Sequence, residues 1–163
     1  MKIIIISDTH GAVNDTVDAI SACRNGCDLI LHLGDVVRDF EYIKNAFPEI
    51  PFVGVLGNND LFSHSYDKEC FFNLDGLSFL ICHGHQYGVK RGYETLLWHA
   101  QSRAADVVLF GHTHECYKER FGEILLFNPG SMKNGDFGII HTHNKMIASV
   151  DFYHLDRLTR KII

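Results

Sequence analysis

The amino-acid sequence predicts an α/β fold in which two β-sheets pack face to face as a sandwich flanked by helices. Two observations lead to this expectation. In the first half of the chain, apolar strand-like runs alternate with helix-like segments, and this βαβαβ pattern is typical of a parallel sheet with right-handed crossovers. In the second half, most strand-like runs come in pairs joined by short turns, which indicates a second, more antiparallel sheet.

The first half is expected to supply three strands and two helices. Residues 2–7 form a continuous run of mainly β-branched apolar residues, as in a strand that is buried on both faces. Residues 14–23 carry apolar side chains at helical spacing, and Asn14 or Asp15 is the expected N-cap. The remaining elements of this half are strands at 28–33 and 51–56 and a helix at 38–47.

The second half is expected to form three hairpins, one helix and one further strand. Asp75-Gly76 is a strong signal for a tight hairpin turn, and Gly122 stands at a second turn. Apolar residues on one face indicate the helix, and Trp98 within it and the many phenylalanines are interpreted as core residues. The hairpin strands are 68–74 with 77–82, 116–121 with 124–127, and 137–142 with 145–152; the helix is 92–103 and the further strand 106–110.

Composition and charge argue against several classes of protein. The formal net charge is −5 and no basic stripe is present, which disfavours nucleic-acid binding by bulk electrostatics. No apolar run approaches the roughly 20 residues of a membrane span, and the apolar start is too short for a signal peptide. The five cysteines are odd in number and scattered, as in a reduced cytoplasmic protein. No repeat, low-complexity segment or linker interrupts the chain, so residues 1–163 are expected to be a single domain.

Metal-capable side chains follow five of the expected strands at their carboxyl ends, which is the edge at which ligands bind in open α/β sheets. A capped turn or a hydrogen-bonded histidine would explain any one of them, but five together predict a metal site. The glycines beside them permit close backbone approach at a crowded site. The five strand ends read Asp8-Thr9-His10, Gly34-Asp35, Gly57-Asn58-Asn59-Asp60, His83-Gly84-His85 and Gly111-His112-Thr113-His114.

Spacing and side-chain chemistry narrow the kind of metal site. Asp8 and His10 are two residues apart, as are His112 and His114, and on an extended backbone such pairs point to the same side. Imidazole, carboxylate and amide ligands without a thiolate suit Mn²⁺, Fe²⁺, Co²⁺, Ni²⁺ or Zn²⁺. His32 lies inside an expected strand, and we interpret it as a core residue or as one that supports a ligand.

These motifs, together with Asn128-Pro129-Gly130-Ser131, resemble those of the calcineurin-like metallophosphoesterases, and in particular the small YfcE-type phosphodiesterases. The resemblance covers essentially the whole chain and implies the family's fold of two sheets flanked by helices. It also implies two divalent metal ions. By this resemblance, Asp8, His10 and His114 would bind the first metal, Asn58, His83 and His112 the second, and Asp35 would bridge both.

The activity that the resemblance implies is that of a metal-dependent phosphoesterase, first of all a phosphodiesterase. Manganese is the favoured metal, with Fe, Ni, Co or Zn as alternatives. A hydroxide that bridges both metals would attack phosphorus in line, with Asp35, Asn58 and His83 as the catalytic set. His85 is expected either to contact substrate or to form a structural hydrogen bond. Asn59 stands where many larger members carry a histidine proposed to assist the leaving group, which leaves the general acid unassigned.

Two other functions are weighed against this one. A catalytically weak scaffold would resemble the phosphoesterase-like subunit of the retromer coat, and the complete ligand set argues against it. A two-metal amidase or peptidase is disfavoured by the Gly-Asn and Gly-His-x-His elements. The expected partner is a small phosphate ester, and a homodimer through Phe71, Phe72 and the C-terminal strand is considered as well. The sequence does not determine the physiological substrate, the choice between diester and monoester, or the native metal.

Overall fold

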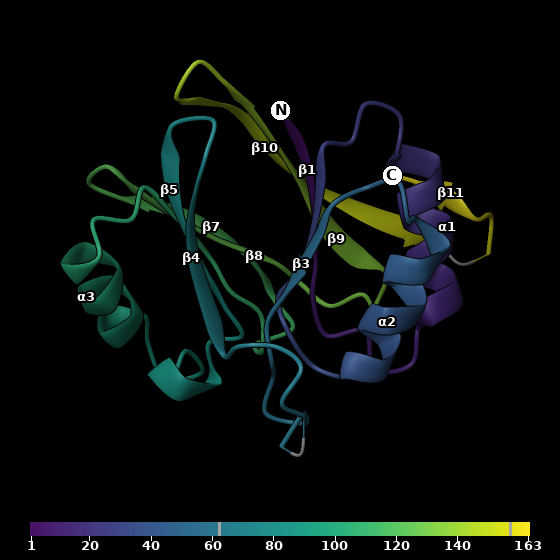
Figure 1. Ribbon diagram of the computed structural model, residues 1–163, viewed down its shortest axis with the longest axis horizontal. Coiled ribbons are helices and arrows are strands. Elements are labelled where there is room, and N and C mark those ends of the chain that lie inside the picture. The colour runs from purple at the N-terminus through teal and green to yellow at the C-terminus, as the bar shows by residue number, and fades with distance from the viewer. Residues whose placement is uncertain (62, 157) are drawn as a thin grey trace.

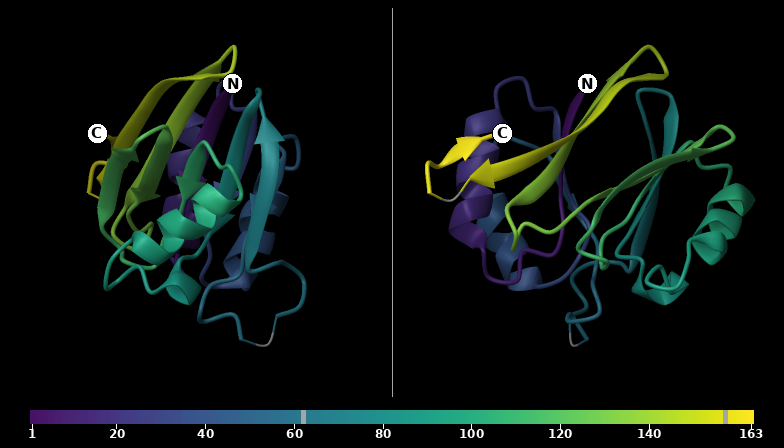
Figure 2. Two further views of the ribbon diagram at one scale, coloured as in Figure 1. Left: turned by 90° about the vertical axis from the view of Figure 1, so that its left-hand side faces the viewer. Right: turned by 180° about the vertical axis from the view of Figure 1, so that it is seen from behind.

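Two sheets with helices on their outer faces make up the protein, as the sequence predicts. The computed structural model describes residues 1–61, 63–156 and 158–163. Figure 1 shows α1 and α2 over the outer face of one sheet and α3 beyond the other. The view from behind in Figure 2 shows the same arrangement, with the two sheets between α1 and α2 on one side and α3 on the other.

The first sheet has six strands in the order β11-β10-β9-β1-β2-β3. Its parallel part is the predicted βαβαβ unit, and each crossover is a helix on the outer face. The last predicted hairpin joins this sheet, because β9 pairs antiparallel with β1. The elements are β1 (Lys2–Ile6), α1 (Val13–Cys23), β2 (Leu29–His32), α2 (Val37–Ala46), β3 (Phe52–Gly54), β9 (Asp136–His143), β10 (Met146–Asp156) and the short β11 (Lys161–Ile162), which the sequence analysis did not anticipate.

The second sheet has five strands in the order β4-β5-β6-β8-β7. Its two edge strands pair antiparallel, but the three central strands β5, β6 and β8 run parallel, so the sheet is mixed. A single-turn 3₁₀-helix, η1, follows β5 and was not expected. The elements are β4 (Glu69–Leu74), β5 (Leu77–Cys82), η1 (His85–Tyr87), α3 (Glu94–Ser102), β6 (Val107–Leu109), β7 (Cys116–Phe121) and β8 (Ile124–Pro129).

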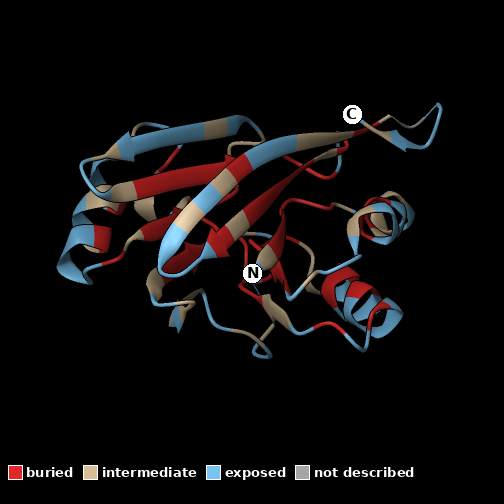
Figure 3. Ribbon diagram, turned by 90° about the horizontal axis from the view of Figure 1, so that it is seen from above, coloured by how far each residue is buried: buried red, intermediate tan, exposed pale blue. Residues whose placement is uncertain are grey.

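Strand β1 shows why the two layers of core form. Successive strand residues point to opposite faces of a sheet. Ile3 and Ile5 therefore pack between the two sheets with Phe79 and Phe127, whereas alternate residues such as Ile4 pack under α1 and α2. Both faces of β1 are buried, which is why the run is apolar without interruption. Figure 3 shows the buried strands between helices whose outer faces are exposed.

Two local expectations are wrong. Helix α1 begins at Val13 after Ala12, so Asn14 and Asp15 lie within its first turn and neither is the N-cap. Trp98 is not a core residue, because 72% of it is exposed. Leu96 and Ala100, four residues apart, form the buried stripe of α3, and a residue halfway between them points to the opposite side of a helix. None of the described helices is long and apolar enough to cross a membrane.

Candidate metal centre

All seven predicted ligands lie at the carboxyl ends of strands, and the structure brings them together where the two sheets meet. Asp8 and His10 follow β1, Asp35 follows β2, and Asn58 follows β3, all from the first sheet. The second sheet contributes the rest, with His83 directly after β5, and His112 and His114 after β6. Their donor atoms form a continuous set in which each lies within 3.8 Å of another.

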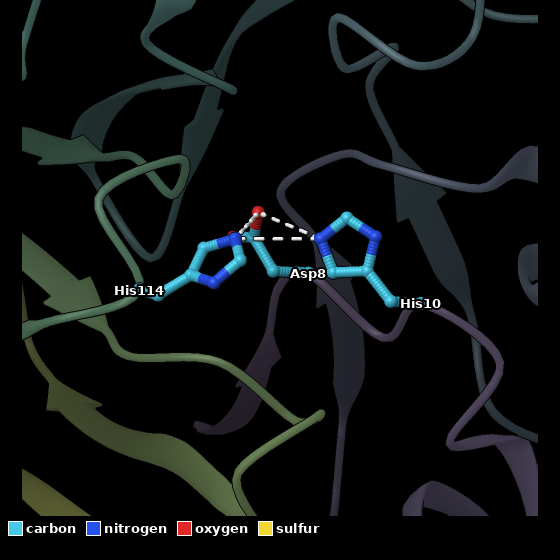
Figure 4. A group of neighbouring side chains, drawn as sticks. All are labelled: Asp8, His10 and His114. Atoms are coloured by element: carbon cyan, nitrogen blue, oxygen red, sulfur yellow. Dashed lines mark hydrogen bonds and ion pairs between the residues drawn. The ribbon is translucent and has the colours of Figure 1, made fainter.

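Three of the ligands form a first group at one side of the centre. The Asp8 Oδ1 atom lies 3.0 Å from His114 Nε2 and 3.8 Å from His10 Nε2, and the two imidazole nitrogens are 3.3 Å apart. Figure 4 shows the carboxylate and both rings directing these atoms toward one point. Three converging donors of this kind can hold one divalent cation.

A second group adjoins the first. His83 Nε2 lies 3.2 Å from Asn58 Oδ1 and 3.2 Å from His112 Nδ1. Asp35 connects the two groups, because its Oδ1 atom is 3.5 Å from His83 Nε2 and its Oδ2 atom is 3.7 Å from His10 Nε2. One oxygen of the same carboxylate thus faces each group, an arrangement that would allow Asp35 to bridge two metal ions.

The hydrogen bonds around the ligands orient the free donor atoms toward the centre. The carbonyl oxygen of Leu33 accepts a hydrogen bond from His83 Nδ1 at 2.8 Å, so the Nε2 atom carries the lone pair. Asp8 Oδ2 accepts from the Ser7 hydroxyl and from the backbone N–H of His112. The other oxygen, Oδ1, is buried and has no hydrogen-bond partner among the described residues. A buried carboxylate oxygen without a donor is costly unless a cation neutralises it, so these residues fit divalent metal ions.

Burial and neighbouring groups keep two of the predicted ligands, His112 and Asp35, in the protonation states that bind metal. Desolvation, together with the nearby His83, lowers the pKa of His112 to about 4, so this imidazole is neutral at pH 7. Burial by itself would raise the pKa of Asp35, but His83 and two hydrogen bonds from Asn59 outweigh it, and the pKa is lowered. The site therefore presents an ionised carboxylate beside a neutral ring, as metal coordination needs.

The backbone reaches this geometry in a way that the sequence analysis did not foresee. The i, i+2 pairs are not on extended backbone: φ is +53° at Asp8, +43° at His10, +69° at His112 and +63° at His114. Left-handed conformations are unfavourable for residues other than glycine and cluster at functional sites. The turns place Asp8 and His10 in one group, but they send His112 and His114 to different groups.

Two glycines make room for the carboxylates. A Cβ atom on Gly57 would lie 1.9 Å from Asp35 Oδ1, and one on Gly111 would lie 2.0 Å from the Ser7 hydroxyl oxygen. Both contacts are far below van der Waals distance, so any side chain would displace the ligand or its support. The structure thus gives these glycines the close-approach role that their position after a strand suggested.

Asn59 is the most important residue whose role the sequence did not reveal. Its backbone N–H donates to Asp35 Oδ1 at 3.0 Å and its side-chain amide donates to Asp35 Oδ2 at 2.7 Å. The following Asp60 is not among the converging ligands, since backbone N–H groups of Val36, Val37 and Gly57 occupy its carboxylate. The only sequence signal for Asn59 was its position directly after a ligand.

The Asn-Pro-Gly-Ser turn is hydrogen-bonded to the loops that carry the predicted ligands. The side-chain amide of Asn128 donates to the carbonyl oxygen of Gly111 at 2.9 Å and to the Thr113 hydroxyl at 3.0 Å, which fixes the loop that carries two ligands. The Ser131 hydroxyl donates to the carbonyl oxygen of Asp8 at 2.9 Å. The turn at the end of β8 thereby holds the ligand loops of both sheets in place.

Two further histidines lie close to the ligands. His32 is fully buried with its ring centroid 3.9 Å from that of Phe40, which confirms it as a core residue, and its Nδ1 atom accepts from the N–H of Gly34. His85, the first residue of η1, has its ring centroid 5.5 Å from that of His83. The Nδ1 atom of His85 is buried and has no hydrogen-bond partner among the described residues.

Comparison with known proteins places this arrangement in a family. The family model of the calcineurin-like phosphoesterase superfamily domain matches residues 1–151. The chain belongs to this superfamily. The calcineurin-like family implies divalent metal ions. Two sets of Asp and His side chains that could each hold a metal ion agree with that implication: Asp8 with His10 and His114, and Asp8 with Asp35 and His83. Its fold of two packed sheets with outer helices is also the one observed here.

Curated members of the superfamily match most of the chain. A probable metallophosphoesterase of Bacillus subtilis, YsnB, is 30% identical over 134 residues, which are 82% of this chain and 76% of the relative. A phosphodiesterase of Methanocaldococcus jannaschii is 31% identical over 149 residues, covering 80% and 83%. The phosphodiesterase YfcE of Escherichia coli is 29% identical over 157 residues, covering 81% and 79%.

Solved structures show the same fold. An archaeal phosphodiesterase superposes with a TM-score of 0.72 at 26% identity, covering 93% of this chain and 99% of its own. Vps29 of Chaetomium thermophilum superposes with a TM-score of 0.82 at 16% identity, covering 100% and 95%. At this low identity, the likeness to Vps29 concerns the fold alone.

Proposed function

We propose that the chain is a metal-dependent phosphodiesterase with a binuclear metal centre. The observation that carries the proposal is the convergence of the donor atoms of all seven predicted ligands into two groups with Asp35 between them. Membership of the superfamily and the two phosphodiesterases among its relatives support the reaction class. When bound, a pair of divalent ions supplies the Lewis-acid charge that activates a water molecule for in-line attack on phosphorus.

Residues of the chain would hold the two metal ions, orient the metal ligands and neutralise part of the positive charge. Asp8 and Asp35 contribute two negative charges against the four of a pair of divalent ions, so the centre keeps an excess that attracts a phosphate group. Leu33 fixes the tautomer of His83, and Asn59 fixes both oxygens of Asp35. His85 is proposed to contact the substrate, because its ring centroid lies only 6.0 Å from that of His112 in the second group.

Asn59 occupies the position at which many larger members of the family carry a histidine that is proposed to assist the leaving group. The amide of Asn59 already donates to Asp35 and has no proton to transfer to a leaving alcohol. General acid catalysis contributes typically 10²–10⁴-fold. We therefore infer that esters with acidic leaving groups, such as nitrophenyl esters, are hydrolysed well and alkyl esters slowly.

The identity of the metal and the cellular location of the protein are parts of the same proposal. The donor set of imidazole, carboxylate and amide oxygen suits Mn²⁺, with Fe, Ni, Co and Zn as alternatives. The five cysteines are all unpaired in the part of the chain that the structure describes, which favours a reducing compartment such as the cytoplasm. The partner is a small phosphate ester, and a homodimer through Phe71, Phe72 and the C-terminal strand remains a proposal.

Elemental analysis and a hydrolysis assay test the proposal together. The purified protein is analysed for bound metals, stripped, reloaded with Mn²⁺ and assayed with bis(p-nitrophenyl) phosphate. Asp35→Asn should lose both metals and all hydrolysis, because this carboxylate faces both groups. Asp151→Asn is the matched control on an exposed position of β10. If Asp35→Asn keeps both metals and full turnover, the assignment of the site is wrong.

The fold similarity to Vps29 keeps a scaffold without strong catalysis as the second candidate. The complete ligand set favours the enzyme. The same assay separates the enzyme from the scaffold. If the protein hydrolyses no phosphate ester after loading with any of the candidate metals, the result favours the scaffold. A panel of amides, assayed beside the esters, tests whether the protein is instead a two-metal amidase or peptidase.

A further inference from the structure

Asp39 contributes a buried carboxylate beside the metal centre and belongs to neither group of predicted ligands. It lies in the first turn of α2, and 7% of the residue is exposed. Its Oδ2 atom accepts one hydrogen bond from the Thr9 hydroxyl at 2.7 Å and another from the backbone N–H of Gly11 at 2.8 Å. A buried carboxylate is costly without such donors. The two bonds, which we call the Asp39 clamp, join α2 to the loop that follows β1.

The Asp39 clamp encloses one metal ligand, because Thr9 and Gly11 are the residues on either side of His10. His10 has a φ of +43°, in the left-handed region. A residue other than glycine adopts this conformation at a cost, and the conformation persists where the surrounding structure holds it. The clamp supplies that constraint on both sides of His10. It therefore fixes the direction in which the imidazole leaves the backbone and approaches Asp8, whose Oδ1 atom is 3.8 Å from His10 Nε2.

The same contacts relate His10 to Asp35, the ligand between the two groups. Asp35 precedes the start of α2 by two positions, so it and Asp39 lie on one short segment of the chain. The Thr9 hydroxyl oxygen is 3.4 Å from the carbonyl oxygen of Asp35, but its single proton serves the shorter contact with Asp39. The loop after β1 is thus held against the segment that carries Asp35. This connection helps to set the 3.7 Å separation of His10 Nε2 and Asp35 Oδ2.

A second carboxylate that is not a predicted ligand, that of Asp60, holds a different part of the site. Its three hydrogen bonds come from the backbone N–H groups of Val36 and Val37 at the start of α2 and of Gly57 after β3. Asp60 therefore holds the loops after β2 and β3 relative to each other, whereas Asp39 holds the loop after β1. Loss of the Asp39 carboxylate should accordingly affect the first group of ligands more than the second.

We propose that Asp39 is a positioning residue for the first metal ion, because its hydrogen bonds on both sides of His10 direct this ligand toward the first group. Asp39 acts through His10 and takes no part in the chemical step. This inference rests on the proposed binuclear centre, since it assigns a residue that sets the metal affinity of one of the two groups. Metal binding tests it without any measurement of hydrolysis.

Calorimetric titration of the metal-free protein with Mn²⁺ measures the role of Asp39. His10→Ala identifies the binding event that belongs to the first group, because that event should be lost. Asp39→Ala should weaken the same event by about 10–100-fold, the usual effect of losing a residue that orients a metal ligand, and should leave the other event within about three-fold. Asp39→Asn should stay within about five-fold of the wild type, because an amide oxygen accepts the same two hydrogen bonds, although more weakly than a carboxylate. Asn45→Ala, at an exposed position of α2, is the control and should bind as the wild type does.

Three results would overturn the inference. They are a loss below about two-fold in Asp39→Ala, an equal loss in both binding events, and an equal loss in the alanine and asparagine variants. The second would show a general structural role, and the third an effect of charge alone. Circular dichroism and thermal unfolding of the metal-free variants check the fold. If Asp39→Ala does not fold, Thr9→Val takes its place, because it removes one of the two hydrogen bonds and preserves the shape of the residue; it should weaken the first event by about three-fold or more.

The titration keeps this inference separate from the proposed function. Protein that binds two Mn²⁺ ions but hydrolyses no phosphate ester would remove the proposed phosphodiesterase and leave the role of Asp39 standing. A wild type with a single binding event that is lost in His10→Ala would remove the binuclear centre, while Asp39→Ala would still decide whether Asp39 positions His10.

Discussion

Removal of the Asn59 side chain should weaken metal binding without dismantling the fold. In Asn59→Ala, the 2.7 Å hydrogen bond to Asp35 Oδ2 is lost, whereas the backbone bond to Oδ1 at 3.0 Å is kept. A hydrogen bond to a charged group contributes about 1.5–3 kcal/mol, and the lower end applies because Asn59 is exposed. About 1.4 kcal/mol is a factor of ten in a binding constant, so the expected loss of metal affinity is about ten-fold. Loss of a residue that orients a ligand typically costs 10–100-fold, in agreement with this value.

Calorimetric titration of metal-free protein with Mn²⁺ measures that loss. Asn45→Ala, at an exposed position of α2, is the matched control and should bind as the wild type does. At saturating Mn²⁺ the Asn59→Ala protein should recover most of its turnover, because the side chain positions Asp35 and does not touch the reacting atoms. An affinity within about two-fold of the wild type would show that Asn59 does not hold the carboxylate, and the reasoning from geometry would fail.

Three further predictions follow from single features of the site. Gly57→Ala should lose metal, because its Cβ atom would lie 1.9 Å from Asp35 Oδ1, and elemental analysis checks this. In a series of phosphodiesters, rates should fall steeply as the leaving group becomes less acidic, since Asn59 cannot protonate it; equal rates on aryl and alkyl esters would refute this. Burial holds the pKa of His32 well below its usual value, so the ring charges in the unfolded chain below about pH 6.5 but not in the folded one. The metal-free protein should therefore lose up to about 1.4 kcal/mol of stability per pH unit below 6.5 from this residue, and His32→Leu should show a shallower pH dependence in denaturant titrations.

Much of the fold follows from local patterns that the sequence displays. The uninterrupted apolar run of β1 indicates a strand buried on both faces, and the structure places Ile3 between the sheets and Ile4 under the helices. Periodicity predicts α3 and its apolar face, and the structure buries Leu96 and Ala100 on that face. Trp98 lies on the opposite side of the helix and is exposed, although its apolar character alone suggested a core residue.

In the candidate site, too, some features could be predicted from the sequence and others are seen only in the structure. The candidate positions could be predicted because each follows a strand and the carboxyl ends of strands meet where ligands bind, and the resemblance to the family then singled out seven of them as ligands. Their local geometry could not: the ligand turns are left-handed at Asp8, His10, His112 and His114, where an extended backbone was expected. The role of Asn59 was hidden as well, since the carboxylate that it holds is 24 residues away in the chain.

The sequence by itself determined the order of strands and helices, the residues at each strand end and the chemistry of their side chains, because these depend on local periodicity and residue type. Only the tertiary structure decided the distances between the ligand atoms, the orientation of one Asp35 oxygen toward each group, and the two hydrogen bonds with which Asn59 holds that carboxylate. These features arise between residues far apart in the chain. Their distances are fixed by how the two sheets pack and by the hydrogen bonds that link their loops, and no local pattern encodes them.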